Sequence, residues 1–175
     1  MDDKFEIIGT SSKKAYRFNI SADLLKIGDK EMEYSYINIA EGVCVMPIYK
    51  GKILCIQQYR FPVRSWEFEF PGGFIDEGET GAEAAARELK EETGLVADEL
   101  VDLGCMFPSF GSTNEKIHMF AAVCSGMGDS DREDFELIRL NEFSVREFKR
   151  LIGEGRFRHG AGLAAWARYG VIRGI

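Results

Sequence analysis

The segment from Thr80 to Gly94 most constrains the fold, because it carries helix signals at both ends. Thr80 and Glu83 have the T-x-x-E spacing of a capping box, which satisfies two backbone amides at the start of a helix. Gly94 stands where a left-handed C-terminal cap is expected. The apolar residues between the caps recur with the helical period at Ala82, Ala85, Ala86 and Leu89. We therefore expect an amphipathic helix whose narrow apolar face packs closely on a sheet.

Strand patterns lie on both sides of this helix. The runs Gly42 to Tyr49 and Ile53 to Tyr59 are rich in β-favouring residues, and Lys50-Gly51-Lys52 between them predicts a tight hairpin. Four further runs have strand character: 15–27, 31–40, 66–70 and 116–124. Helical periodicity returns after residue 144 and over 163–172. This order predicts an α/β or α+β sandwich, preceded by a small N-terminal antiparallel strand pair.

Composition bounds the organisation and the partners of the chain. With 175 residues, 45% of them apolar, and no repeat or Pro-rich linker, we expect one domain with a short extra element. The net charge of −7 argues against a basic surface that binds nucleic acid. No run approaches the roughly 18 apolar residues that span a bilayer, and the first four residues lack the layout of a signal peptide. We therefore expect a cytoplasmic protein that binds neither nucleic acid nor membrane.

Three acidic side chains, those of Glu88, Glu91 and Glu92, share one side of the expected helix. Glu88 lies i,i+3 from Glu91 and i,i+4 from Glu92, so all three can point the same way. Like charges at this spacing cost roughly 0.2–0.5 kcal/mol per pair, a penalty that a divalent cation would reverse. Hard oxygen ligands favour Mg²⁺ or Mn²⁺. The alternative is a solvated helix face on which Arg87 and Lys90 balance the acids.

The segment before the helix suits contact with a metal or a phosphate, because it contains the loop Pro71-Gly72-Gly73 and the acidic turn 76–79. Gly73, Glu79 and the stretch Arg87-Glu88-Leu89-Lys90-Glu91-Glu92-Thr93-Gly94-Leu95 match the Nudix box at nine positions over 23 residues without a gap. The chain thus resembles the Nudix hydrolases. The resemblance implies an α/β/α sandwich with a mixed β-sheet over residues 41–175, preceded by N-terminal strands in residues 1–40.

Segments outside the box are similar to ADP-ribose pyrophosphatase-like members of that family. Gln57-Gln58-Tyr59-Arg60 and Glu69-Phe70-Pro71-Gly72-Gly73 look like their Q-Y-R and E-x-P-x-G segments, and residues 109–115 resemble their S-P-G-x-x-x-E loop. Phe110 stands where those enzymes have a proline, which breaks the usual ADP-ribose marker. The resemblance implies Mg²⁺-dependent hydrolysis of a nucleoside diphosphate linked to another moiety. ADP-ribose or a related nucleotide sugar is the expected substrate, giving a nucleoside monophosphate and a sugar phosphate.

The resemblance also implies roles for individual residues. The expected metal ligands are the Gly72 carbonyl and the carboxylates of Glu88, Glu91 and Glu92. Glu115 is the candidate for orienting or deprotonating the attacking water, acting with Glu91 and Glu92, and Arg60 would hold a substrate phosphate. The structural positions of the box are Gly73, Glu79, Arg87 and Gly94, with a salt bridge between Glu79 and Arg87. The simpler alternatives are a solvated loop acid at Glu115 and a surface ion pair at Arg60.

Other functions remain open on the sequence alone. The broken marker at Phe110 leaves room for another substrate class, such as a dinucleotide or an oxidised nucleoside triphosphate. A module that binds a nucleotide without hydrolysing it is the non-enzymatic alternative, although such modules usually lose box glutamates that are all present here. The N-terminal strands resemble those with which subfamily members form a homodimer, so we expect a homodimer by analogy.

Overall fold

Residues 5–130 and 137–174 are described by a computed structural model, which divides into two compact units. The first unit contains residues 5–40 and 107–116, and the second contains the described residues of 41–106 and 117–174. Of the described elements, the second unit holds all three helices and six of the nine strands. None of these helices is long and apolar enough to cross a membrane.

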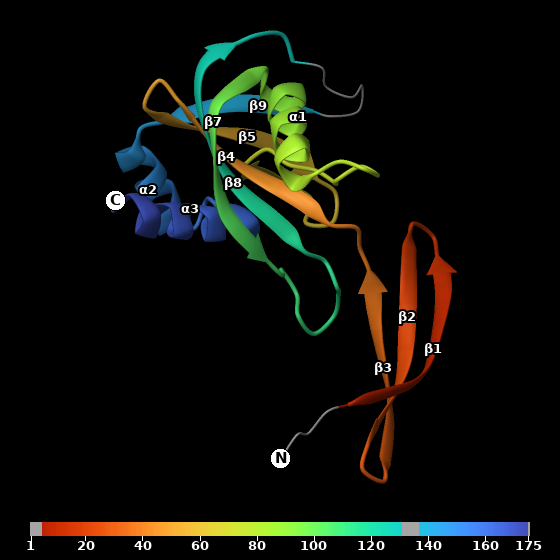
Figure 1. Cartoon of the computed structure of the whole chain (residues 1–175). Helices are drawn as coiled ribbons and strands as arrows, with labels where there is room; N and C mark the ends of the chain where they lie inside the picture. Colours follow the sequence, from red (N-terminus) through yellow and green to blue (C-terminus); the bar gives the residue numbers. More distant parts are fainter. Residues whose placement is uncertain (1–4, 131–136, 175) are drawn as a thin grey trace. The chain divides into compact units, whose positions relative to one another are not determined.

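The first unit is a three-stranded antiparallel sheet with the order β1-β2-β3 (Figure 1). Its strands are Glu6–Ala15, Phe18–Ile27 and Lys30–Asn38. The sequence predicts β2 and β3 but not β1, which is exposed along nearly its whole length and therefore lacks an apolar alternation. The segment 107–116 is tied to β3, because the Ile37 N–H donates to the Ser112 carbonyl and the Tyr34 hydroxyl to the Gly111 carbonyl, both at 2.9 Å.

The second unit contains a six-stranded mixed sheet with the order β6-β5-β4-β8-β7, and β9 pairs with β5. Its strands are β4 Gly42–Tyr49, β5 Lys52–Arg60, β6 Ser65–Glu69, β7 Leu95–Met106, β8 Ile117–Met127 and β9 Ile138–Phe143. Among the described strands of this sheet, β4 and β8 pair in parallel and the other pairs are antiparallel. The predicted hairpin joins β4 to β5, and Lys50 and Gly51 have the positive φ values, 50° and 75°, that a two-residue turn needs. The sequence did not predict β7, which is half exposed, or the short β9.

Helices cover both faces of this sheet, as Figure 1 shows. They are α1 Gly81–Thr93, α2 Val145–Gly153 and α3 Gly160–Arg173. Successive residues of β4 alternate between two cores: Val43 and Val45 pack with α1, whereas Cys44 and Met46 pack with α2 and α3. Side chains of a strand point to opposite faces in turn, so a strand buried throughout has a layer on each side. The predicted α/β/α sandwich is therefore confirmed.

Helix α1 has both predicted caps. The Thr80 N–H donates to Glu83 at 2.8 Å and the Glu83 N–H donates back to Thr80 Oγ1, while Gly94 is left-handed with φ of 75°. The predicted apolar face is partly wrong, because Ala82 and Ala86 are exposed. The buried residues of the helix are Ala84, Ala85, Leu89, Glu92 and Thr93. The helix is thus rotated so that it buries an acid along with its apolar residues.

An aromatic cluster fixes the C-terminal part of the second unit. Phe70 after β6, Phe148 of α2 and Phe157 of the following loop are all buried. The ring centroid of Phe157 lies 5.0 Å from that of Phe70 and 4.9 Å from that of Phe148. Trp166 of α3 adds a further edge contact to Phe148 at 5.1 Å. The loop between α2 and α3 is therefore anchored next to the end of β6.

Candidate active site

The loop of residues 71–73 is fixed on strand β4. The Val45 N–H donates to the Pro71 carbonyl at 2.8 Å, and the Val43 N–H donates to the Gly73 carbonyl at 2.9 Å. A Cβ added to Gly72 would overlap the carbonyl oxygen of Val43, so only glycine lets the loop approach the strand this closely. The loop backbone is thereby held rigidly at the end of β6.

Two predicted metal ligands of α1 contact this loop. Glu92 is only 5% exposed, and its Oε2 accepts a hydrogen bond from the Gly72 N–H at 2.9 Å. The carboxylate of Glu88 lies directly over Gly73, where an added Cβ would overlap it. Gly73 therefore leaves room for the Glu88 carboxylate, while the Gly72 N–H binds that of Glu92. The structure brings Gly72, Gly73, Glu88 and Glu92 together.

Arg87 links the other acidic residues of the box. Its Nε and Nη2 bind the two carboxylate oxygens of Glu79 at 3.0 and 2.9 Å. Its Nη1 donates to Glu88 at 2.8 Å and to Glu91 at 3.1 Å. These hydrogen bonds, the pair with Glu79 first, raise the pKa of Arg87, and Arg87 in turn lowers the pKa of Glu79. Three glutamates share one arginine, so the group keeps a surplus of negative charge.

The chemistry of this donor set fits a divalent cation. Carboxylates of Glu88, Glu91 and Glu92 beside the backbone of Gly72 offer the hard oxygens that Mg²⁺ and Mn²⁺ prefer. Buried carboxylates in surplus over their cations are costly, and a bound cation would relieve that cost. As the side chains stand, no group of three or more His, Cys, Asp or Glu residues in the described ranges converges on a metal position. Cation binding would require Glu88 or Glu91 to exchange Arg87 for the ion.

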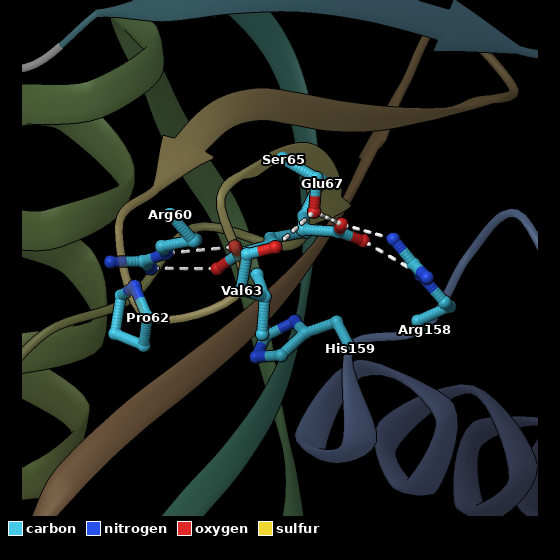
Figure 2. A pocket seen from close by; sticks show the side chains of 8 residues that line it. Arg60, Pro62, Val63, Ser65, Glu67, Arg158 and His159 are labelled. Carbon is cyan, nitrogen blue, oxygen red and sulfur yellow. Dashed lines mark hydrogen bonds and ion pairs between the residues drawn. The ribbon is translucent and has the colours of Figure 1, made fainter.

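A pocket of about 490 Å³ lies on the β6 side of the loop, and Figure 2 shows the side chains that line it. Arg60 of β5 binds both carboxylate oxygens of Glu69 through Nε and Nη2, at 2.8 and 2.6 Å. Arg158 binds Glu67 in the same two-pronged way, with Nε 2.9 Å from Oε2. The Ser65 hydroxyl donates to the same carboxylate, and these hydrogen bonds lower the pKa of Glu67. The predicted phosphate ligand Arg60 thus lines the pocket while paired with Glu69.

Glu69 connects the pocket with the acidic edge of α1. It lies three residues before Gly72 in the chain, whose N–H binds Glu92. Burial, followed by the charges of Glu69 and Glu92, raises the pKa of the Cys44 thiol on β4. Both carboxylates thus disfavour ionisation of the same buried thiol. The pocket and the acidic edge are neighbouring parts of one unit.

Of the eight residues that line the pocket, Arg60 was predicted as a site residue, and those that sequence reasoning missed include Arg158 and His159. The Nδ1 atom of His159 accepts a hydrogen bond from the Phe70 N–H at 3.2 Å, and burial lowers the pKa of the imidazole. The packing of Phe157 on Phe70 brings this loop to β6. These partners are separated by more than eighty residues in the chain, and no short motif signals such a contact.

Glu115, the predicted base, belongs to the 107–116 segment of the first unit. Its N–H donates to Thr113 Oγ1 at 3.4 Å, and burial raises the pKa of its carboxyl group. The preceding Asn114 anchors the segment, because its side-chain oxygen accepts from the Ile39 N–H at 2.9 Å. Phe110, which replaces the proline of the subfamily marker, has a side chain that is 83% exposed. A carboxylate whose pKa is raised is a stronger base than an ordinary glutamate.

The model of a known protein family matches most of this chain. The model of the NUDIX domain matches residues 39–163, well over half of the chain. The chain belongs to the Nudix family. Nudix hydrolases generally need divalent metal ions, which agrees with the oxygen donors on α1.

Three relatives with assigned activities align with this Nudix chain. It is 30% identical over 105 residues to the ADP-ribose pyrophosphatase of Bacillus subtilis (strain 168), covering 59% of this chain and 57% of that protein. It is 35% identical over 94 residues to the ADP-sugar pyrophosphatase of Mus musculus, covering 50% and 42%. It is 40% identical over 79 residues to the ADP compounds hydrolase NudE of Escherichia coli (strain K12), covering 44% and 42%. The chain thus spans about half the length of these relatives.

A solved structure shares the fold of the Nudix chain almost throughout. The crystal structure of an ADP compounds hydrolase superposes with a TM-score of 0.85 and covers 95% of this chain, which covers 92% of that one. The two sequences are 23% identical, so this likeness concerns the fold. It agrees with a mixed sheet between helical layers and a separate three-stranded sheet.

Proposed function

We propose that this Nudix protein is a Mg²⁺-dependent pyrophosphohydrolase, able to use Mn²⁺, that acts on a nucleoside diphosphate linked to another moiety. The proposed substrate is ADP-ribose or a related nucleotide sugar, and the products are a nucleoside monophosphate and a sugar phosphate. The observation that carries the proposal is the placement of Glu88 and the buried Glu92 against the glycine loop. The names of the Bacillus subtilis and Mus musculus relatives support the substrate class.

The cation would be held by Glu88, Glu91, Glu92 and the Gly72 carbonyl. When bound, a divalent cation neutralises the pyrophosphate and lowers the pKa of water. Glu79 holds Arg87 through two hydrogen bonds, and Arg87 in turn orients Glu88 and Glu91, so both are positioning residues. Gly73 gives Glu88 its space and Gly94 ends the helix, which are the structural roles expected of these positions.

The proposed reaction is attack by water on phosphorus. A bond forms between the water oxygen and phosphorus, and the bond from phosphorus to the bridging oxygen breaks, so that oxygen leaves with the departing phosphate. Glu115 would accept the proton of the water, aided by the raised pKa of its carboxyl group, and Glu91 and Glu92 complete the catalytic centre. Arg60 would bind a substrate phosphate, which competes with Glu69 for its guanidinium.

A substrate panel tests this proposal. The protein is incubated with Mg²⁺ and ADP-ribose, other nucleoside diphosphate sugars, dinucleotides, and standard and oxidised nucleoside triphosphates, and phosphatase-sensitive product is measured. Glu92→Gln is the inactive control. We expect preference for a nucleotide sugar that the control abolishes. Turnover confined to dinucleotides or oxidised triphosphates would overturn the substrate class, and nucleotide binding without any turnover would indicate a regulatory module.

We also propose that the protein is a homodimer whose interface includes the β1–β3 sheet. Ile7 of β1 and Met32 of β3 flank Leu25 of β2 on one face of this sheet, and both are exposed. Exposed apolar surface of this kind is typical of association sites. Light scattering at micromolar concentration should give twice the chain mass of 19.7 kDa, and a monomer mass would overturn the dimer. A cytoplasmic location, expected from the sequence, likewise stays a proposal.

A further inference from the structure

We propose that Arg158 and His159 bind the sugar on the non-nucleotide side of the substrate and so determine specificity. This inference rests on the proposed function and adds to it a subsite outside the Nudix box. The two residues lie between α2 and α3 and line the pocket with Arg60, Glu67 and Glu69 (Figure 2). Four observations carry it: an anchored loop, an oriented imidazole, balanced charge and the spacing along β6.

The loop that presents Arg158 is held in place by its neighbours. The buried ring of Phe157 packs against both Phe70 and Phe148. The N–H groups of Arg156 and Phe157 both donate to the Leu151 carbonyl, at 3.0 and 3.3 Å. A side chain that is carried on ordered backbone loses less conformational freedom when it binds a ligand. Arg158 is therefore presented to the pocket before a substrate arrives.

The backbone of β6 also orients the imidazole of His159. His159 occupies the N-cap of α3 but makes no side-chain capping hydrogen bond, because its Nδ1 accepts from the Phe70 N–H instead. A neutral imidazole with Nδ1 as acceptor carries its proton on Nε2, and burial favours that neutral form by lowering the pKa. A Cβ on Gly162 would approach Nδ1 to 3.0 Å, so glycine there gives the ring its room. His159 thus offers one N–H donor in the pocket lining.

The charges of the pocket balance. Arg60 pairs with Glu69 and Arg158 pairs with Glu67, so two positive and two negative side chains sum to zero. Figure 2 shows Arg60 and Arg158 on opposite sides of Glu67. A phosphate taken by Arg60 would leave no surplus cation among these residues for a second phosphate. Paired donors and acceptors without net charge suit the vicinal hydroxyls of a sugar.

The spacing along β6 separates the Glu67–Arg158 pair from the Glu69–Arg60 pair by about the length of one sugar. Ser65, Glu67 and Glu69 alternate along the strand and share one face, with successive positions about 7 Å apart. The Glu69 end leads into Gly72, which contacts Glu92 of α1. A sugar phosphate extending from the acidic edge along β6 would therefore meet Arg60 first and the Arg158 pair next.

The matched variants for a test are Arg158→Ala and Arg156→Ala. Both side chains lie in the same loop and are similarly exposed, at 62% and 56%, but Arg156 does not line the pocket and pairs with Glu154 at 3.7 Å. We measure KM and kcat for ADP-ribose, and inhibition by each product, ribose 5-phosphate and AMP. Loss of Arg158 should raise KM and weaken ribose 5-phosphate inhibition, each about tenfold, because a hydrogen bond to a charged group is lost. Inhibition by AMP should stay unchanged, and Arg156→Ala should resemble the wild type.

Arg158→Lys keeps the charge but not the planar fork, and it serves if the alanine variant does not fold. It should weaken ribose 5-phosphate inhibition in the same direction by a smaller factor. If the wild type hydrolyses nucleotide sugars but Arg158 variants match Arg156→Ala, the sugar subsite is overturned and the proposed function stands. Equal weakening of the inhibition by ribose 5-phosphate and by AMP would also overturn the subsite, since a general distortion of the protein would then explain both changes. Absence of any nucleotide sugar turnover by the wild type would overturn both.

Discussion

The acidic edge of α1 and the pocket beside β6 both combine arginine with glutamate, but in different proportions. At the acidic edge of α1, the single arginine of the helix, Arg87, contacts three glutamates, namely Glu79, Glu88 and Glu91. In the pocket, each glutamate has an arginine of its own. A surplus of carboxylates attracts a cation, whereas a balanced set suits an uncharged polar group. The ratio of the two residue types therefore distinguishes two ligand sites that use the same chemistry.

The largest effect is expected from removing one charge of the surplus. Glu88→Gln should lower kcat by about 100- to 1000-fold, because a neutral amide is a poor ligand for a divalent cation. Steady-state kinetics with saturating Mg²⁺ measures this, and circular dichroism checks the fold. The control is Glu77→Gln in the exposed turn before α1. A loss smaller than fivefold would show that Glu88 does not hold the cation.

The next largest effect is expected from filling the space that the Glu88 carboxylate occupies beside Gly73. Gly73→Ala places a methyl group where the Glu88 carboxylate lies and should reduce kcat by about 10- to 100-fold. Gly126→Ala is the matched control, because a Cβ there meets no atom within 4 Å. Activity and thermal unfolding are compared for both variants. Equal activities would mean that the position of Glu88 is unimportant.

Removing the only arginine of the α1 group should make stability depend more on the cation. Arg87→Gln leaves three carboxylates without their shared partner and should lower the unfolding midpoint without metal by about 5 °C. Addition of Mg²⁺ should then raise the midpoint more than in the wild type. Scanning calorimetry with and without Mg²⁺ measures both effects, with the exposed Arg150→Gln as control. If Mg²⁺ raised the unfolding midpoint equally in the variant and the wild type, the surplus of carboxylates at the acidic edge of α1 would be contradicted.

The smallest effect is a pH dependence from the balanced pocket. Burial lowers the pKa of His159 in the folded state, so the unfolded state binds the proton more readily as pH falls through about 6.5. The contribution of His159 to the free energy of unfolding should thus be fully present above that pH. Below it, this contribution should decline by less than about 1.4 kcal/mol per pH unit. Urea unfolding at pH 7.5, 6.5 and 5.5 should show a flatter profile for His159→Asn. Parallel profiles would show that His159 is not held neutral.

The acidic edge could be predicted because its geometry is local. The caps of α1 lie fourteen residues apart, and the spacing of Glu88, Glu91 and Glu92 follows from the helical period alone. The hydrophobic period nevertheless misplaced the buried face, since Glu92 is buried while Ala82 and Ala86 are exposed. Contact with the glycine loop orients the helix, and that contact is not encoded in the period.

The pocket could not be predicted because its partners are distant in the chain. Arg158 meets Glu67 across 91 residues, and His159 meets Phe70 across 89. The aromatic packing of Phe157 makes these contacts possible, and a buried phenylalanine carries no sequence signal of its partner. Strand β1 was missed for the opposite reason, since an exposed strand has no apolar pattern to detect.

Binding of Mn²⁺, followed by the electron paramagnetic resonance signal of the free ion, tests the contrast between the two sites most directly. The wild type and Glu67→Gln should deplete free Mn²⁺ equally, because Glu67 belongs to the balanced pocket. Glu92→Gln should bind Mn²⁺ at least about tenfold more weakly, because it removes a buried carboxylate from the proposed cation ligands on α1. Unchanged Mn²⁺ binding by Glu92→Gln, or loss of binding in Glu67→Gln, would contradict the assignment of the cation to α1.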